Sequence, residues 1–259
     1  MKDRISWEIR SRLHNGKLNT NSKLIPSDPD RFTQFLFEEA KSKGVRFLQG
    51  VTVSSLSIID GQISGVYAIR VENGASVSVP CDNLVIAAGP WTGPLSEVLL
   101  PKPIPITSFA GHSIILTPSV PPSADCLMAI VHTENSTYRA QIIPRSSGEI
   151  YISGINDTLD LPPTPDAAVI QATEIAKLKL IADTLLPEYS IKHEQLCFRP
   201  MTKQGLPFIT AHPEVKGVYV AGGHGHFGII LGPGTGKVLS EMILGEVLSA
   251  DINQLPALE

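Results

Sequence analysis

The glycine-rich segment near the C-terminal end has residue types and a spacing that could place bare backbone next to a ligand. Gly223-His224-Gly225-His226-Phe227-Gly228 fits the pattern G-x-G-x-x-G and directly follows the strand-like run Val218 to Ala221. In a dinucleotide-binding βαβ unit this pattern forms the turn that holds a pyrophosphate. Only 31 residues follow Gly228, and Gly232-Pro233-Gly234 is expected to interrupt a helix that starts there, so the unit cannot be completed. The sequence therefore argues against a dinucleotide turn at this place.

A second glycine cluster, Gly232 to Lys237, is not an ATP-binding P-loop. Leu231 stands where that motif needs its first glycine, and Val238 replaces the hydroxyl residue that follows the lysine. Both clusters can bring backbone amides close to a flat, electron-accepting ring at the start of a helix, whose dipole favours negative charge. A reduced flavin carries such charge at its N1 and O2 edge. The alternative, that the glycines only let a strand and a helix pack closely, stays open.

Length and charge narrow the class of ligand. The chain has 259 residues, of which 42% are hydrophobic and 18% are charged, which is enough for a sizeable core and excludes a disordered chain. The net charge of -4, without a long run of either sign, gives no electrostatic reason to expect a nucleic acid or an anionic membrane as a partner. A small molecule is the expected ligand, and the oligomeric state is left open.

The cysteines and the apolar runs point to a reducing compartment. Cys81, Cys126 and Cys197 lie far apart without a C-x-x-C pair, so neither a disulfide framework nor a thiolate metal site is expected. Cys81 and Cys126 are expected in the core. The first residues lack the apolar stretch of a signal peptide, and no apolar run seen in the sequence approaches the ~20 residues that span a bilayer. The sequence predicts a cytoplasmic protein without membrane insertion.

The first third of the chain predicts one helix, a β-meander and a buried strand. The turn dipeptide Asn15-Gly16 and the polar loop 19–22 are the only signals in residues 1–23. Asp28-Pro29 predicts the N-terminus of a helix over about residues 29 to 43. Three β-type runs follow, separated by Asp60-Gly61 and Asn73-Gly74, which suit tight hairpins: 51–59, 62–71 and 75–79. The continuous apolar run that ends at Gly89 is typical of a strand buried on both faces.

The remaining chain predicts a second, mostly antiparallel sheet and a return to the first layer. Strand-like stretches alternate with polar breaks at 104–117, 126–132, 138–144 and 149–155. A helix is expected to open at Thr164-Pro165-Asp166 and to stop before Pro187, with a strand near 191–198 behind it. The expected C-terminal elements are a buried strand at 217–222, a glycine-rich turn at 223–236 and a closing helix at 237–248.

Four segments of the chain form an ordered set. They are Pro26 to Phe32 with the downstream Gly50 to Val53, Asn83 to Thr92, Phe198 to Pro207, and Val218 to Ile229. The set resembles the FAD-dependent oxidoreductases of the D-amino-acid oxidase family, which includes glycine oxidase and sarcosine oxidase, over about residues 24 to 247. Within that family it is most similar to a cytoplasmic fungal subgroup of oxidoreductases, one of which is linked to endosomal traffic.

The resemblance implies a mixed α/β (α+β) fold of two interleaved domains. An incomplete FAD-binding layered α/β domain would comprise residues 24–95 and 197–250, and an antiparallel-sheet substrate domain residues 96–196. The implied cofactor is FAD and the implied substrate a small amine or amino acid. In this family a hydride passes from the amine-bearing carbon to flavin N5, and oxygen then reoxidises the flavin. Because the flavin carries the hard step, no acid/base pair or nucleophile triad is needed.

Most candidate residues are assigned to the cofactor by the resemblance. Val53 would contact the adenine through its backbone, and the end of the buried strand would pass the adenosine and pyrophosphate through Ala88, Gly89 and Trp91. The glycine-rich loop would contact the isoalloxazine ring through Gly223, His224, Gly225, Phe227, Gly228 and Ile229. The alternatives are a core tryptophan at a strand end, and turn histidines, His224 and His226, without chemistry.

Two further residues are candidates by position. Arg199, before Pro200, stands where amino-acid oxidases of the family carry the arginine that grips the substrate carboxylate, and a guanidinium suits bidentate carboxylate binding. A salt bridge is the alternative role. Cys197 stands where sarcosine oxidases carry the cysteine that is linked covalently to the flavin, although its flanking residues resemble the non-covalent members. Tyr138 and Tyr151 are candidate helpers of Arg199 without an assigned place. Lys237 and Glu241 are expected to form a solvated i, i+4 pair.

One departure from the family bears on function. Family members begin with a β-strand and a G-x-G-x-x-G turn that hold the FAD pyrophosphate, far upstream of the helix expected here at residue 29. Residues 1–28 contain no such motif, so the chain is interpreted as truncated, and the strands beside the gap are expected to have unpaired edges. Two functions stay open: an FAD-dependent oxidase, and a non-catalytic remnant that acts as an interaction protein. A nicotinamide dehydrogenase would rest only on the rejected glycine motif.

Overall fold

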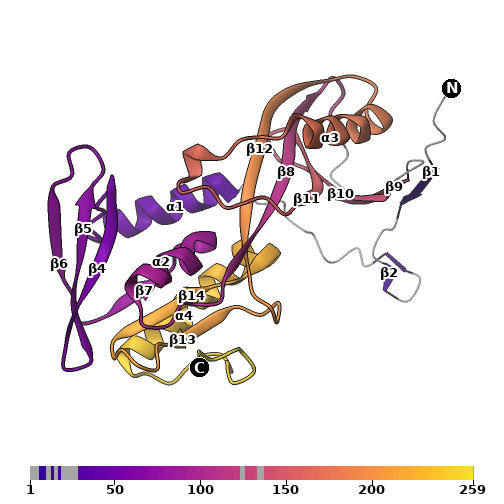
Figure 1. Ribbon diagram of the computed structural model, residues 1–259. Coiled ribbons are helices and arrows are strands. Elements are labelled where there is room, and N and C mark those ends of the chain that lie inside the picture. The colour runs from indigo at the N-terminus through magenta and orange to yellow at the C-terminus, as the bar shows by residue number, and fades with distance from the viewer. Residues whose placement is uncertain are drawn as a thin grey trace. The chain divides into compact units, whose positions relative to one another are not determined.

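The computed structural model describes residues 6–9, 13–14, 17–18, 29–122, 126–132 and 137–258. It has the predicted mixed α/β structure, and its backbone contacts divide the chain into two compact units (Figure 1). Unit 1 consists of Met1–Leu36 and Ala110–Cys197, and unit 2 of Phe37–Phe109 and Phe198–Glu259. The domain limits derived from the sequence, after residues 95 and 196, stay a prediction.

Unit 1 is built on a six-stranded sheet with the order β1-β9-β10-β11-β8-β12. The strands are β1 (Ser6–Ile9), β8 (Thr107–Pro118), β9 (Leu127–His132), β10 (Thr137–Pro144), β11 (Ile150–Asp157) and β12 (Tyr189–Met201). The four pairs from β1 to β8 are antiparallel, which confirms the predicted second sheet. A two-stranded ladder of β2 (Leu13–His14) and β3 (Lys17–Leu18) flanks the predicted Asn15-Gly16 turn, which itself lies outside the described residues, as does the loop 19–22.

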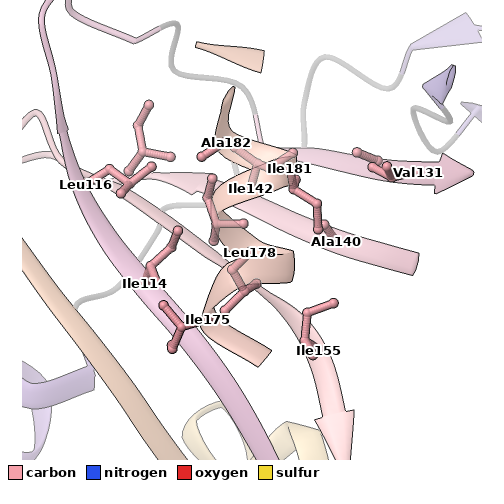
Figure 2. Packing of buried hydrophobic residues seen from close by; sticks show 13 residues of the cluster. Ile114, Leu116, Val131, Ala140, Ile142, Ile155, Ile175, Leu178, Ile181 and Ala182 are labelled. Atoms are coloured by element: carbon pink, nitrogen blue, oxygen red, sulfur yellow. The ribbon is translucent and has the colours of Figure 1, made fainter. Parts of the chain in front are cut away.

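Helix α3 (Ala172–Leu185) covers one face of this sheet, and the residues between helix and sheet form a hydrophobic core (Figure 2). Ile175, Leu178 and Ala182 recur at the predicted helical spacing and are buried against strand residues such as Ile114 and Ile142. The apolar periodicity of the sequence therefore identified the buried side of α3 correctly, because residues three and four apart share one face of a helix.

The start of α3 differs from the prediction. Thr164-Pro165-Asp166 opens only the short 3-10 turn η2 (Pro165–Ala167), and α3 begins after Gln171. The chain between them leaves the helical conformation at Ala168, with φ -69° and ψ 126°, where β-branched residues follow that disfavour a helix. The N–H of Gln171 donates to Nε2 of His112 at 3.1 Å, which holds the helix start against β8.

His112 should make unit 1 less stable in acid. Its ring is fully buried and Nε2 accepts the Gln171 N–H, so the neutral ring carries its proton on Nδ1. Burial lowers the pKa of His112 below the value of an exposed histidine. The unfolded state therefore binds more protons, and the free energy of unfolding should fall as the pH drops below about 6.5, the unfolded pKa of histidine. Urea unfolding between neutral and mildly acidic pH measures this slope, and His112→Asn should flatten it. An unchanged slope in the variant would contradict the assignment.

Unit 2 contains two three-stranded sheets. The first has the order β13-β14-β7, with β13 (Phe208–Ala211), β14 (Val218–Gly222) and β7 (Leu84–Ile86). β13 and β14 are antiparallel, whereas β14 and β7 are parallel. The second is the predicted meander of β4 (Val51–Ile59), β5 (Gln62–Arg70) and β6 (Ser76–Pro80) (Figure 1). The first hairpin turns at Asp60 and Gly61, both with positive φ, as the Asp-Gly dipeptide predicts.

The β13-β14-β7 sheet has a hydrophobic core on each of its two faces. Val218, Val220 and Ile86 face a cluster that includes helix α2 (Thr92–Leu99). Tyr219 and Ala221 face helix α4 (Gly228–Leu244) through its C-terminal half. β7 differs from its prediction on one point: it is not buried on both faces, since Val85 is 38% exposed. It is also the last strand of its sheet among the described residues.

Helix α4 begins much earlier than expected. A 3-10 turn η3 (Gly225–Phe227) leads directly into α4 at Gly228, and the helix runs through Gly232-Pro233-Gly234 instead of starting at Lys237. The proline is tolerated because it lies in the solvent-exposed part of the helix, where water can bond the carbonyl of Ile229 that loses its partner. The expectation that Gly232-Pro233-Gly234 interrupts a helix there was therefore wrong. The short chain that remains after Gly228 still leaves no room for a βαβ unit.

The segment Gly225–Leu244 is long and apolar enough to cross a membrane by length and composition alone, with a mean hydropathy of 1.2. This corrects the expectation that no stretch approaches that length. The glycines and the proline had interrupted the row of large apolar side chains, but they add little polarity. Buried helices of soluble proteins meet the same criterion, although only 22% of this window is buried.

Helix α1 (Pro29–Ser42) confirms the helix predicted near residues 29 to 43, and its proposed N-cap, Asp28, lies outside the described residues. None of its residues is buried. The ring of Phe37 lies 4.2 Å from that of Phe47, in the connection to β4. The amphipathic pattern therefore predicted the helix without predicting a partner for its apolar face.

Candidate functional site

Two loops of unit 2 meet at the carboxyl ends of β7 and β14. The strands run parallel in register, with Val218 opposite Leu84 and Val220 opposite Ile86. A Cβ atom placed on Gly222, at the end of β14, would lie 3.6 Å from Oγ1 of Thr92, behind the end of β7. The structure thus brings together the Ala88-to-Trp91 loop and the Gly223-to-Ile229 loop at the carboxyl ends of the strands, where open α/β sheets bind ligands.

The two glycines that end β14 have a packing role. A Cβ on Gly222 would lie 2.9 Å from Cδ1 of Ile106, and one on Gly223, where φ is +83°, would lie 2.3 Å from Cγ2 of Thr202. Real Cβ atoms do not approach so closely. For these two positions the close-packing alternative therefore holds, whatever else the backbone contacts.

Two other glycines face open space. Gly89 has φ +57° and no atom of the described chain within 4 Å of its Cβ position. Gly228, the first residue of α4, has only Cβ of His224 near it, at 3.9 Å. Their backbones are therefore accessible, and Gly228 stands at the start of α4, where the helix dipole is positive. This is the arrangement that can accept a negatively charged ring edge.

His224 fastens the loop to α4. Its Nε2 lies 2.8 Å from Oγ1 of Thr235, which is buried two turns along the helix. Burial lowers the pKa of His224, so the ring is kept neutral. The geometry favours the reading of His224 as a turn residue that positions the loop, although its assignment to the cofactor stays a prediction.

The end of β12 places Arg199 beside the same loop. Sδ of Met201 lies 3.4 Å from the Cβ position of Gly225, and Arg199, two residues earlier in β12, is on the same face of that strand as Met201. Burial lowers the pKa of His226, and the charge of Arg199 lowers it further. Arg199 and His226 of unit 2 therefore lie within electrostatic range of each other, and Arg199 supplies the positive charge of this pair.

The other predicted residues occupy different places. Val53 lies in β4 next to a bulge and packs on the core that includes residues of α2. Trp91 ends the 3-10 turn η1 (Gly89–Trp91) and donates its backbone N–H to the Ala88 carbonyl. Phe227 is 59% exposed, so the apolar end of the glycine loop is not covered by the described chain.

The cysteines and the two candidate tyrosines have ordinary structural surroundings. Cys197 is exposed and donates its thiol to the Gly111 carbonyl at 3.5 Å in unit 1. Cys126 is exposed, contrary to the expected core position, because it lies just before β9 and outside its apolar pattern, whereas Cys81 packs on the core of unit 2. Tyr138 packs beside Lys177 and Tyr151 beside Arg145, all in unit 1. The covalent-flavin assignment of Cys197 stays a prediction.

The predicted pair on α4 forms, but one partner is not solvated. Nζ of Lys237 lies 3.0 Å from Oε1 of Glu241, with the lysine side chain 63% and the glutamate side chain 10% exposed. Glu241 also accepts the backbone N–H of Ser249 at 2.8 Å, and this bond, with Lys237, lowers its pKa. Glu241 therefore ties the chain after α4 back to the helix.

Sequence reasoning missed three residues that shape the site. Met201 and Thr202 pack under the glycine loop, and the buried Oγ1 of Thr92 has no hydrogen-bond partner among the described residues. Met201 and Thr202 lie in the Phe198-to-Pro207 segment, two and three residues after Arg199. This position next to a candidate residue was the available signal.

The two loops fit part of a flavin nucleotide. The accessible backbone of Gly89 and Gly228 follows the carboxyl ends of the parallel strands β7 and β14, and the apolar side chain of Phe227 is exposed in the same loop as Gly228. Among the described residues, however, the parallel part of the sheet has only β14 and β7, and neither strand is followed by a complete pyrophosphate-binding βα turn. The fit therefore covers the ring side and the β7 loop but not a pyrophosphate clamp.

Comparisons with known proteins point to one family. The family model described as FAD-dependent oxidoreductase matches residues 12–242. A Schizosaccharomyces pombe protein named as an oxidoreductase is 31% identical over 271 residues, covering 97% of this chain and 68% of that protein. Glycine oxidase of Bacillus subtilis is 28% identical over 185 residues, covering 68% of this chain and 45% of the enzyme.

A solved structure agrees at the level of the fold. The glycine oxidase of Geobacillus kaustophilus superposes with a TM-score of 0.65 at 22% identity, over 83% of this chain and 54% of that protein. The chain thus spans about half the length of the glycine oxidases that it matches.

Proposed function

Because the chain belongs to the family of FAD-dependent oxidoreductases, we propose that it forms the substrate half and the ring side of the cofactor site of an amine or amino-acid oxidase. The observation that supports this proposal is that the charge of Arg199 acts on His226, in the glycine loop that follows the parallel strand β14. The similarity to glycine oxidase supports a small amino acid or amine as the substrate.

FAD, when bound, would supply the redox chemistry by accepting a hydride from the amine-bearing carbon. The Gly223-to-Ile229 loop would hold the ring through the backbone at the start of α4, and the loop from Ala88 to Trp91 would hold the adenosine side. Arg199 would bind the substrate carboxylate through two parallel hydrogen bonds and so orient the reacting carbon. Phe227 would exclude water from the ring, since it is apolar and exposed at the loop.

The experiment is a cofactor titration. The purified chain is incubated with excess FAD and passed through a desalting column, and the visible spectrum of the protein fraction is recorded. We expect stoichiometric flavin that bleaches when glycine or another small amino acid is added without oxygen. A protein that stays colourless, alone and joined to the segments of the fungal relative that it does not span, would refute the proposal.

A second function, that of an interaction protein without catalysis, is favoured by one observation. The β13-β14-β7 sheet ends at a partly exposed strand, β7, among the described residues. Stable complex formation without any flavin binding would select this function over the first.

A further inference from the structure

Unit 2 has a cavity along β13 that lies apart from the two loops of the candidate site. Its volume is about 440 Å³, which is within the range of cavities that hold small organic ligands. Phe208 at the start of β13 and His212 just behind its end both line this cavity, named here the β13 cavity. The backbone N–H of His212 donates to the Val218 carbonyl at 2.7 Å, so this part of the cavity lies at the start of β14, whereas the flavin-loop candidate Gly223 follows the other end of that strand.

The ring of His212 is buried with its proton in a fixed place. The residue is 6% exposed, and its Nδ1 accepts the backbone N–H of Glu214 at 3.2 Å and that of Val215 at 3.1 Å. A ring nitrogen that accepts carries no proton, so the neutral ring is protonated on Nε2. Burial lowers the pKa of His212 and so keeps the ring neutral. The Nε2–H has no acceptor among the described residues, and it belongs to a side chain that lines the cavity.

Lys102 brings a positive charge to the same wall. Its Nζ lies 3.2 Å from Oε1 of Glu214, and its side chain is 60% exposed. An ammonium group has three donors, so an ion pair with one carboxylate still allows a second acceptor. After burial, which is the largest cause, the charge of Glu214 raises the pKa of His212 and that of Lys102 lowers it. The ammonium group and the His212 ring are therefore within electrostatic range of each other.

The rest of the wall is mainly apolar. Pro103 and Pro105 have no N–H, Phe208 is buried, and Leu258 packs on the core that includes residues of α2. Gln204 is the remaining polar side chain among the described residues that line the cavity, and none of these residues is acidic. The side chains of the wall therefore offer hydrogen-bond donors, one positive charge and apolar surface. A ligand that complements them has an anionic acceptor group and a hydrocarbon body.

We infer that the β13 cavity binds a small carboxylic acid with an apolar body, whose carboxylate accepts hydrogen bonds from Nε2 of His212 and from Nζ of Lys102. The hydrocarbon part would lie against Phe208 and Leu258. A carboxylate is favoured over a neutral carbonyl because charge-assisted hydrogen bonds are roughly twice as strong. An amine is disfavoured, since it would meet the ammonium group of Lys102. The inference goes beyond the proposed function, because this binding needs neither FAD nor Arg199.

The experiment is a calorimetric titration of the purified chain, without FAD, with cyclohexanecarboxylate. Cyclohexanecarboxamide and cyclohexylmethylamine carry the same ring with a neutral group and a cation. We expect the carboxylate to bind at one site per chain and at least about tenfold more tightly than the carboxamide, and the amine not to bind. Because no cofactor takes part, this result can be obtained even if the chain fails to bind flavin.

His212→Asn and Lys102→Met test the two donors separately. Asparagine Oδ1 can accept the two backbone N–H groups that His212 Nδ1 accepts, so the turn is kept while the Nε2–H is lost. Lys102→Met removes the charge from a largely exposed side chain of similar length. Each variant should weaken binding of cyclohexanecarboxylate at least about tenfold. Lys43→Met removes an exposed lysine of the same unit that does not line the cavity, and should bind like the parent chain.

Three results would overturn the inference. The first is no binding of cyclohexanecarboxylate at millimolar concentrations, or binding that both His212→Asn and Lys102→Met leave unchanged. The second is equally tight binding of the carboxylate, the carboxamide and the amine, which would show that the ring alone is recognised. The third is loss of binding in Arg199→Ala while His212→Asn binds normally, which would place the acid at the candidate site instead of the β13 cavity.

Discussion

The variant Gly154→Ala is expected to lose about 3 kcal/mol or more of unfolding free energy, a large part of the ~5–15 kcal/mol that stabilises a typical protein. Gly154 lies in β11, where the register with β8 shifts between Ser153 and Ile155. Its φ of +128° is a conformation that other residues rarely adopt, and a Cβ there would lie 2.0 Å from the Arg139 carbonyl oxygen. Backbone strain and a clash with a backbone atom therefore add up. Urea unfolding followed by circular dichroism measures the loss.

Gly148 provides the matched control in the same unit. It also has a positive φ, +86°, but no atom lies within 4 Å of its Cβ position. Gly148→Ala should therefore cost only the conformational penalty of about 1–2 kcal/mol. Equal losses in the two variants would show that the close contact at Gly154 is not responsible.

The variant Arg199→Ala is expected to lower kcat/KM for substrates with a carboxylate by about 10²–10⁴-fold in the FAD-loaded protein, because two charge-assisted hydrogen bonds of about 1.5–3 kcal/mol each are lost. Arg199→Lys keeps the charge but loses the planar fork, and should retain an intermediate rate. Initial rates of dye reduction with a small amino acid, and with the matching amine that lacks the carboxylate, measure the effect.

The amine without a carboxylate is the internal control for this prediction. Its rate should change little in Arg199→Ala, since the guanidinium has nothing to grip. Lys203→Ala, an exposed cation in the same segment, should leave both substrates unaffected. An equal loss for both substrates would assign Arg199 to the fold or to the flavin instead of the carboxylate.

Secondary structure followed from the sequence wherever a local pattern coincided with the final environment. The spacing of Ile175, Leu178 and Ala182 predicted the buried side of α3, and Asp60-Gly61 predicted a hairpin whose two residues have positive φ. The start of α4 was predicted wrongly, because glycine and proline usually end helices. Gly232 and Pro233 lie in the exposed first turns of α4, where water can bond the backbone groups that the helix leaves unpaired. The chain therefore continues as a helix.

The roles of the site residues depended more strongly on contacts between distant segments. Local sequence could not distinguish Gly223, whose Cβ position is blocked by Thr202, from Gly89, which faces open space. Nor could it predict that His224 bonds Thr235, because that bond requires the helix to begin at Gly228. The short strand β13 was missed for a similar reason: its four residues are defined by pairing with β14, not by a long pattern of their own.

The amino-acid sequence by itself determined the family, the order of most helices and strands, and the chemical types that can bind a carboxylate or approach a flat ring, since these depend on composition and on neighbours along the chain. The tertiary structure alone decided which glycines are packed against neighbouring side chains, which strand ends a sheet among the described residues, and that the charge of Arg199 acts on His226 in the loop after β14. These properties depend on excluded volume and hydrogen-bond pairing between segments far apart in the chain, which no local spacing encodes.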